Sequence, residues 1–498
     1  MAPSPAATGV ANRTRGPLAR VRLAVRERPR GARHVLCYVP RAMLQRVPRS
    51  PDAPRAPRPP RTPRKFPAEA ALLFAVGFVL RAAYTWAANG RTPVPYADSA
   101  DYDTIAWNLA RGAGFALNGA AGPHATAFRP PVVPWLTSLL YRVTGHDFFA
   151  ALLLQCALGA LVAPALASYA KGTFGPGVAK WAGWLAALCP LLVFFSGYLL
   201  TETTFALLLV VALHLSAEWI KTPRPGRALG AGLAWGVATL TRPTALPLPL
   251  LVALWAWFPL GLTVNGRDRV RQVAMLLLGV ALAIGPWTLR NAAQFGAFVP
   301  VTTGGGRALL DANNPLVWDD PQHAGGAFSV YHLEPYAARY RGLSEVQADA
   351  LSTRLAKEFL AERRAQWPAM AAAKLARTWR LGREGGGSGT WAREGSPVAR
   401  LLAVADPLLL WSLVAFPLAL AGVWVTLRGP KRLFLSLPLV AIGFFTALVV
   451  VYWGALRMRV PIEPLVVLYA AAGADALWRA VRLRRSGLTV IEGRGNAA

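Results

Sequence analysis

The chain has 498 residues, of which 54% are hydrophobic and only 16% are charged. Soluble globular chains are about a quarter charged, and the apolar residues here fall into blocks of about 20 that contain almost no Asp, Glu or Lys. This pattern excludes a soluble enzyme on a single anchor. It also excludes an outer-membrane barrel, whose alternating segments span about 10 residues.

Residues 1–66 form a basic, proline-rich segment. It holds fifteen arginines, one lysine and twelve prolines against two acidic residues, and so carries +14 of the chain's formal net charge of +30. Such a segment cannot bury enough apolar surface to offset the entropy lost on ordering, so we expect a disordered cytoplasmic tail whose charge suits anionic lipid rather than nucleic acid. The alternative is an extension ahead of a later true start, such as Met43.

Ten apolar blocks predict ten transmembrane helices. The predicted fold is therefore an all-α integral membrane protein, a polytopic bundle with two long extracytoplasmic loops that carry juxtamembrane helices. We expect a transmembrane catalytic domain at 67–482 and a cytoplasmic C-terminal tail at 483–498. The predicted spans are about 68–88, 147–169, 177–197, 200–220, 228–243, 246–263, 272–289, 407–427, 433–453 and 461–480.

Basic residues gather in the short loops that share one side of a ten-span bundle. By the positive-inside rule this side is the cytoplasm, so both termini are expected to be cytoplasmic. The protein is expected in the plasma membrane, which is the inner membrane of a cell that has two membranes. The two long loops, about 89–146 and 290–406, then face outward. An amphipathic stretch at 344–379 predicts a helix that lies on the membrane or covers a site. The basic residues are Lys171, Lys180, Lys221, Arg224, Arg227, Arg267, Arg269, Arg271, Arg428, Lys431, Arg432, Arg479, Arg482, Arg484 and Arg485.

Ionisable residues from separate stretches fall at the outer face, where short loops should lack arginine. Inside a bilayer such residues face a bundle interior or a cavity and mark functional sites, so their convergence predicts an anionic ligand and a base. Individual members of the set also have non-functional explanations. The Arg242 side chain can extend to lipid headgroups, Glu202 can be an N-terminal carboxylate stabilised by the helix dipole, and Asp101 can be an ordinary acid of a first helical turn. The set comprises Asp98, Asp101, Arg129, Glu202, Arg242, Arg290, Arg457 and Arg459.

Short motifs accompany these residues in a fixed order. Asp98 and Tyr102 stand in an Asp-x-x-x-Tyr arrangement, and Arg129 precedes Pro130-Pro131. The remaining pieces are Leu200-Thr201-Glu202, the stretch 286–291, the stretch 299–303, Asn313-Asn314-Pro315 and the stretch 457–464. Together they resemble the lipid-carrier-dependent glycosyltransferases of the GT-C superfamily, in the branch of protein O-mannosyltransferases and aminoarabinose transferases. Two departures are Ser99, where an acid often follows the Asp, and Arg129, where the branch often has Lys.

The resemblance implies transfer of a sugar, with inversion, from a polyprenyl-phosphate donor to a hydroxyl of a protein, lipid or glycan at the outer face. Asp98 is the expected base. Glu202 is expected to orient the acceptor, bind a divalent ion or hold an arginine. Arg129 and Arg290 are the expected phosphate ligands, with Arg242, Arg457 and Arg459 in reserve. Asp101 and Tyr102 are expected to line the site. Arg457 and Arg459 would point to opposite sides of an extended chain, so one of them is expected to reach it.

The sequence indicates no definite cofactor. Three cysteines and six histidines without ligand spacing predict no metal site, although a divalent cation is compatible with the carboxylates. Gly304-Gly305-Gly306 and Gly385-Gly386-Gly387 are expected to be flexible loop glycines.

The alternative function is that of a transporter or flippase for an anionic or lipid-linked substrate. It explains the spans and the interfacial arginines but not the long loops and motifs. A head-group transferase would need a nucleophile or metal cluster in an outer domain.

Overall fold

The computed structural model describes residues 65–485 except 91, 96, 121 and 381–405. The chain divides into two units, residues 58–478 and residues 1–57 with 479–498. The fold and site described below belong to the first unit. Nearly all of the predicted tail at 1–66, most of the predicted tail at 483–498 and the glycines at 385–387 lie outside the described residues.

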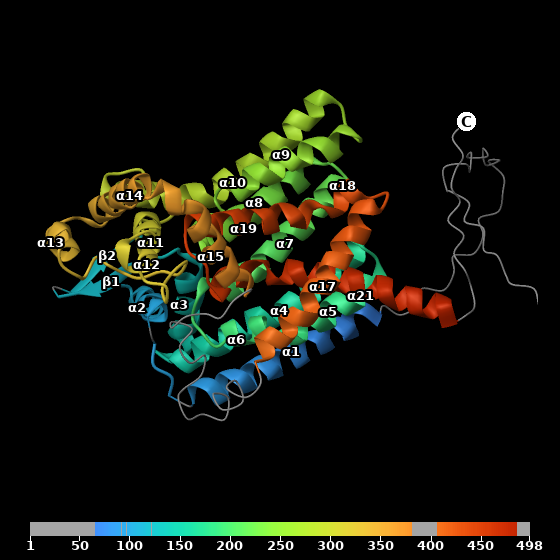
Figure 1. Ribbon diagram of the computed structural model, residues 1–498, viewed down its shortest axis with the longest axis horizontal. Coiled ribbons are helices and arrows are strands. Elements are labelled where there is room, and N and C mark those ends of the chain that lie inside the picture. Colours follow the sequence, from blue (N-terminus) through green and yellow to red (C-terminus); the bar gives the residue numbers. More distant parts are fainter. Residues whose placement is uncertain (1–64, 91, 96, 121, 381–405, 486–498) are drawn as a thin grey trace, which may run out of the picture. The chain divides into compact units, whose positions relative to one another are not determined.

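Helices long and apolar enough to cross a membrane dominate the fold, which confirms the prediction of an all-α multi-pass membrane protein (Figure 1). Within the described residues there are seven such segments. They are α1 (Lys65–Asn89), α4 (Phe148–Thr173), α7 (Thr201–Lys221), η2 (Pro243–Ala245) with α9 (Leu248–Gly261), α10 (Gly266–Phe295), α17 (Pro407–Arg428), and α20 (Leu456–Arg459) with η4 (Val460–Ile462) and α21 (Glu463–Arg485).

The other three predicted spans coincide with helices that are shorter or interrupted, so the prediction of ten spans is approximate. The span expected at 177–197 is α5 (Pro176–Leu188) followed by α6 (Pro190–Phe195), because Pro190 cannot continue the hydrogen-bond ladder of α5. The span expected at 228–243 is α8 (Pro225–Thr241), with 17 residues. The span expected at 433–453 is α18 (Arg432–Leu435) and the 15-residue α19 (Leu437–Val451).

The interruption after α5 leaves backbone carbonyls without helical partners inside the bundle, and an arginine of α1 binds them. Arg81 is fully buried and donates to the carbonyl oxygens of Ala186 and Ala187 at 3.3 and 3.1 Å. A broken helix is tolerated at membrane depth only where neighbouring groups satisfy its backbone in this way. Arg81 is therefore a structural cation of the bundle.

The last helix is central to the packing. The apolar window of α21 is 83% buried, against 22% for those of α10 and α17. Glycines allow the closest helix contacts: a Cβ at Gly422 of α17 or Gly473 of α21 would overlap the backbone of the other helix. Gly232 of α8 and Gly279 of α10 meet in the same way. Small residues at such crossings are usual in membrane bundles, where close van der Waals contact drives association.

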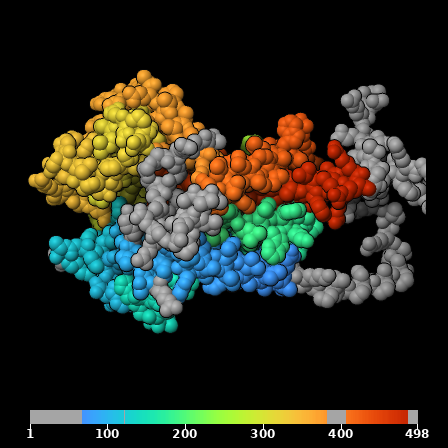
Figure 2. Space-filling model, turned by 60° about the horizontal axis from the view of Figure 1, so that its bottom comes forward, coloured from blue at the N-terminus to red at the C-terminus, as the bar shows by residue number. Residues whose placement is uncertain are grey.

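Two long segments gather at one end of the bundle (Figures 1 and 2). The first contains α2 (Asp98–Ala110), the hairpin of β1 (Ala116–Gly119) and β2 (Gly122–Ala125), and α3 (Val132–Thr144). The second contains α11 (Gly305–Ala312), α12 (Pro315–Trp318), α13 (Tyr336–Tyr340), α14 (Glu345–Glu362), η3 (Arg364–Gln366) and α15 (Trp367–Trp379). These are the segments predicted to be outer loops.

Two local expectations need correction in the second segment. The single helix expected at 344–379 is two helices, α14 and α15, joined through η3; α14 begins at a capping box of Ser344 and Gln347. The glycines expected in a flexible loop form the start of α11. Gly306 packs so closely on α14 that a Cβ would overlap the carbonyl oxygen of Asp349. Close helix packing, and not mobility, accounts for that glycine.

Candidate active site

A cavity of about 290 Å³ lies where the two long segments meet the ends of the membrane helices. Its charged lining comes from distant parts of the sequence, which only the fold brings together. Asp98 begins α2, Arg129 precedes α3, and Arg242 ends α8. Arg307 and Asp311 belong to α11, and Tyr102 of α2 also faces the cavity. The cavity therefore brings together acids, guanidinium groups and a phenol.

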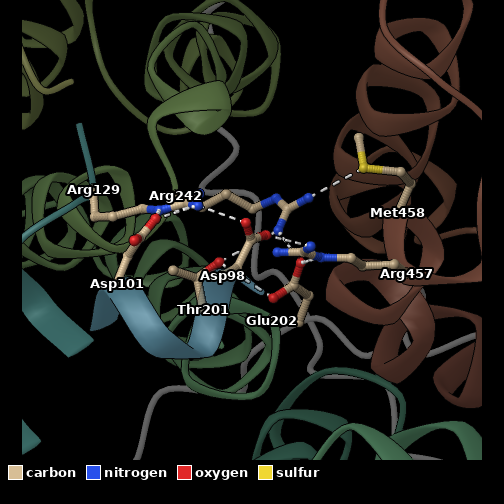
Figure 3. Close-up of polar contacts among 8 residues, drawn as sticks. All are labelled: Asp98, Asp101, Arg129, Thr201, Glu202, Arg242, Arg457 and Met458. Carbon is tan, nitrogen blue, oxygen red and sulfur yellow. Dashed lines mark hydrogen bonds and ion pairs between the residues drawn. The ribbon is translucent and has the colours of Figure 1, made fainter. Parts of the chain in front are cut away.

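Asp98 is bound by two arginines, one on each carboxylate oxygen. Its Oδ1 lies 2.5 Å from Arg129 Nη2, and its Oδ2 lies 2.6 Å from Arg457 Nη1 (Figure 3). Burial alone would raise the pKa of this carboxyl, but the Arg457 and Arg129 guanidinium groups outweigh burial and hold the pKa well below its usual range. Asp98 is thus ionised throughout the neutral pH range and held in a fixed orientation.

Arg129 is positioned by both acids at the start of α2. In addition to Asp98, it donates from Nε and Nη2 to Asp101 Oδ2 at 3.0 and 2.8 Å. Its guanidinium carbon lies 4.6 Å from the ring centroid of Phe128 and 5.5 Å from that of Tyr102. A guanidinium group is planar, so its contacts with these rings and carboxylates fix the plane of Arg129 and the direction of its remaining N–H groups.

Glu202 shares Arg457 with Asp98 and is fully buried near the start of α7. Its Oε1 accepts from Arg242 Nη1 at 3.0 Å and from Arg457 Nε at 2.5 Å. Arg242 also contacts the sulfur of Met458 at 3.3 Å. Arg457 therefore bridges the carboxylate of a membrane helix and the carboxylate of the first long segment, as Figure 3 shows.

Three carboxylates and three guanidinium groups make one neutral network. Asp98, Asp101 and Glu202 are each within 3.0 Å of at least one of Arg129, Arg242 and Arg457. A buried charge is tolerated when it is paired in this manner and becomes strongly unfavourable when a partner is removed.

Two arginines expected to bind phosphate are used elsewhere. Arg290 is not at the start of a loop, because α10 continues to Phe295. Its Nη1 and Nη2 donate to the carbonyl oxygens of Thr126 and Phe115 at 2.8 and 3.2 Å. Arg459 is fully buried against Glu463, with Nε 2.9 Å from Oε2. Neither residue lines the cavity. Of the pair at 457 and 459, Arg457 alone reaches the network, because the two point to different sides of the short helix α20.

Two charged residues of the cavity, Arg307 and Asp311, are not among the site residues predicted from the sequence, which singles out only the neighbouring Gly304-Gly305-Gly306 as loop glycines. Arg307 has no carboxylate within 4 Å among the described residues. Its guanidinium carbon lies between two rings, 5.2 Å from the centroid of Phe128 and 4.9 Å from that of Tyr331. Asp311 follows one turn later on α11. A helical reading of 305–312 would have placed 307 and 311 on one face.

Metal ligation has no support in the part of the chain that the structure describes, where no group of three or more His, Cys, Asp and Glu side chains is arranged to hold an ion. The three acids of the network, Asp98, Asp101 and Glu202, direct their oxygens to arginines.

Comparison with known proteins gives a family match over part of the chain and a similarity of fold. Residues 128–287 match the model of the family described as dolichyl-phosphate-mannose-protein mannosyltransferase. The archaeal oligosaccharyltransferase AglB from Archaeoglobus fulgidus, solved with an inhibitory peptide and a dolichol-phosphate, is similar with a TM-score of 0.52 and 16% identity. That similarity covers 87% of this chain but 53% of AglB, so this chain spans about half the length of that protein.

A second solved structure is similar over most of both chains. ArnT from Cupriavidus metallidurans, bound to undecaprenyl phosphate, gives a TM-score of 0.39 at 18% identity and covers 84% of this chain and 79% of that one. No curated protein matches by sequence. The family match and the fold of AglB confirm the resemblance to the GT-C superfamily that the motifs indicate.

Proposed function

Because the chain has the family match and the fold of a GT-C glycosyltransferase, we propose that it moves a sugar from a polyprenyl-phosphate donor to an acceptor hydroxyl at the extracytoplasmic face. The observation that carries the proposal is the cavity in which Asp98 faces Arg129, Arg242 and Arg307. A transferase of this kind needs a proton acceptor and fixed cations around one reaction centre. The family match favours this reading over a transporter.

The donor phosphate is expected to bind Arg307 and Arg129. Arg307 is the cavity-lining guanidinium group without a carboxylate partner among the described residues, so no ion pair must break before it binds an anion. Its position between Phe128 and Tyr331 limits its motion. A planar guanidinium group can bind two phosphate oxygens at once, which holds the leaving group in one orientation.

The transfer step needs a base opposite the leaving phosphate, and we assign this role to Asp98. The acceptor oxygen attacks the anomeric carbon while its proton passes to Asp98. The bond from that carbon to the phosphate oxygen breaks, and polyprenyl phosphate leaves with the electron pair. Attack opposite the leaving group inverts the anomeric configuration. Growing negative charge on the phosphate is stabilised by guanidinium groups that are already in place.

Binding of the donor would also make Asp98 a better base. Both of its oxygens are held by arginines in the structure, and its pKa is accordingly low. A phosphate that draws Arg129 toward itself weakens one of these contacts, which raises the pKa of Asp98 and frees Oδ1 for the acceptor. Glu202 retains Arg242 and Arg457 during this exchange and is proposed to keep the network positioned.

The extracytoplasmic side is inferred from the directions of α7 and α8. Helix α7 starts beside Glu202 at the cavity and ends at Lys221, and α8 begins after Arg224 and ends beside Arg242. The basic loop Lys221–Arg227 is therefore at the opposite ends of both helices. The positive-inside rule assigns that loop to the cytoplasm, which places the cavity and both long segments outside. We propose that both termini are cytoplasmic on the same grounds.

A deletion strain tests the function whatever the sugar and the acceptor are. Mass spectrometry of its lipid extract is expected to show accumulation of a polyprenyl-phosphate sugar, and its envelope should lack the corresponding glycoconjugate. Plasmid-borne wild-type protein should reverse both changes. The accumulated lipid names the donor, and the missing conjugate names the acceptor. An unchanged lipid profile in the deletion strain would refute the transferase.

A further inference from the structure

We propose that Asp311 takes up a proton when a lipid-linked phosphate enters the cavity, and that the protonated carboxyl then donates a hydrogen bond to that phosphate. The inference rests on the proposed function and goes beyond it, since it assigns a proton-linked binding role to a residue outside the predicted motifs.

The geometry places Asp311 beside the expected phosphate position. It lines the same cavity as Arg129, Arg242 and Arg307, and it follows Arg307 by one helical turn on α11. Residues four apart on a helix share one face. Asp311 Oδ1 is buried and has no hydrogen-bond partner, an arrangement that is unfavourable for a polar atom unless a ligand completes it. A protonated Oδ1 can donate to a phosphate oxygen held by Arg307.

The charge balance of the site also indicates proton uptake. The network of Asp98, Asp101 and Glu202 with Arg129, Arg242 and Arg457 is neutral. Arg307 and Asp311 add one charge of each sign. A phosphodiester brings one further negative charge into a partly buried cavity. The least unfavourable way to restore neutrality is to protonate the carboxylate with the weakest ionic partners. Of the two carboxylates that line the cavity, Asp98 and Asp311, Asp311 is the one that has no ion pair within 4 Å in the described part of the chain.

The pKa of Asp311 supports this assignment. Burial raises its pKa to about 6, although a hydrogen bond from Ser329 and the charge of Arg307 favour the ionised form. A bound phosphate would raise it further. The proton comes from solvent and returns there when the lipid leaves, and no covalent bond changes. The charged groups that act on Asp311 are Arg307 on α11, Asp98 on α2 and Arg129 before α3, and the phenol of Tyr340 on α13 also interacts with it electrostatically.

The test uses the methyl diester of undecaprenyl phosphate, whose single charge does not change near neutral pH. Binding to the full-length protein in phosphatidylcholine nanodiscs is measured by tryptophan fluorescence between about pH 5.5 and about pH 8. If the pKa of a group rises when the probe binds, the affinity for the probe is constant at pH values below the pKa of that group in the unbound protein. Above that value affinity falls by up to about tenfold per pH unit, until the bound pKa is reached.

Asp311→Asn, which is neutral at every pH, should bind the probe with an affinity close to the low-pH value of the wild type and without this slope. Asp349→Asn is the matched control, because Asp349 is a half-buried acid of the same segment that binds the amide of Gly306 and does not line the cavity. It should keep the wild-type slope.

A second measurement does not depend on any variant. Titration calorimetry of the wild type at neutral pH, in buffers of different ionisation enthalpy, should show uptake approaching one proton per bound probe. A flat affinity profile, a slope that persists in Asp311→Asn, or no proton uptake overturns the inference while leaving the proposed function standing. Failure of the probe to bind at any pH removes both.

Discussion

Arg457 and Asp98 are separated by 359 positions in the sequence, yet Arg457 Nη1 lies 2.6 Å from Asp98 Oδ2. The same guanidinium group holds Glu202 through Nε. The start of the last transmembrane segment is thereby connected to α2, the first helix of the first long segment, and to the buried start of α7. The expected base is consequently positioned by three elements at once.

Replacing Asp98 by Asn should abolish sugar transfer while preserving the cavity. We expect a loss of about 10²- to 10⁴-fold, because the amide cannot accept the acceptor's proton. Asp101→Asn is the matched control: it changes the other acid on Arg129 but keeps an oxygen that can accept the same hydrogen bonds. Transfer from the accumulated donor lipid in isolated membranes measures both. Equal losses in the two variants would contradict the assignment of Asp98 as the base.

Replacing Glu202 by Gln should lower stability strongly. Glu202 is fully buried between Arg242 and Arg457, and removing one partner of a buried ion pair costs about 3–5 kcal/mol. Glu218→Gln, on the same helix, removes a partly exposed pair with Lys221 and should change stability by about 0.5 kcal/mol or less. Thermal unfolding in detergent compares them. A similar midpoint for the two variants would exclude Glu202 as the centre of the network.

Substitutions of Arg307 and Arg290 should have different effects, the first on phosphate binding and the second on stability. Arg307→Gln should weaken binding of undecaprenyl phosphate by at least about tenfold, because Arg307 faces the cavity without a paired acid among the described residues. Arg290→Gln should leave affinity close to that of the wild type in the folded fraction and lower thermal stability, because Arg290 holds the carbonyls of Phe115 and Thr126. The reverse result would restore Arg290 as the phosphate ligand.

The buried pair Arg459–Glu463 should behave as a structural pair. Arg459→Met leaves Glu463 charged and unpaired, with an expected loss of about 3–5 kcal/mol. Adding Glu463→Gln should recover most of that loss, because Gln keeps an acceptor for the indole N–H of Trp411. Affinity for undecaprenyl phosphate should be the same in the double variant and the wild type. Thermal unfolding and undecaprenyl phosphate binding give the two readouts.

The sidedness of the cavity can be measured by labelling with a membrane-impermeant maleimide in intact cells. With Cys37 replaced by Ser, the remaining Cys156 and Cys189 are buried. Gln322→Cys, in an exposed turn of the second long segment, should react. Thr222→Cys, in the exposed basic loop after α7, should react only after the cells are opened. Labelling of Thr222→Cys in intact cells would contradict the proposed orientation and indicate the opposite one.

The sequence itself determined the membrane architecture and most of the charged residues of the candidate site. Apolar block length predicts spans, because a bilayer requires helices of a minimum length. Asp98, Arg129, Glu202, Arg242 and Arg457 could be identified because ionisable residues at a membrane face are unfavourable unless they have a partner or a function. Where Pro190 interrupts the third expected span, the same composition could not show that the helix stops there.

Tertiary structure alone decided which of these residues meet. Arg290 and Arg457 look alike as interfacial arginines, but the first binds loop carbonyls and the second joins Asp98 to Glu202. Arg307 and Asp311 reach the cavity because α11 packs against α14 through Gly306, a contact that no local pattern encodes. The physical reason is that charge and hydropathy depend on single residues, whereas the partner of a charged group depends on how distant helices pack.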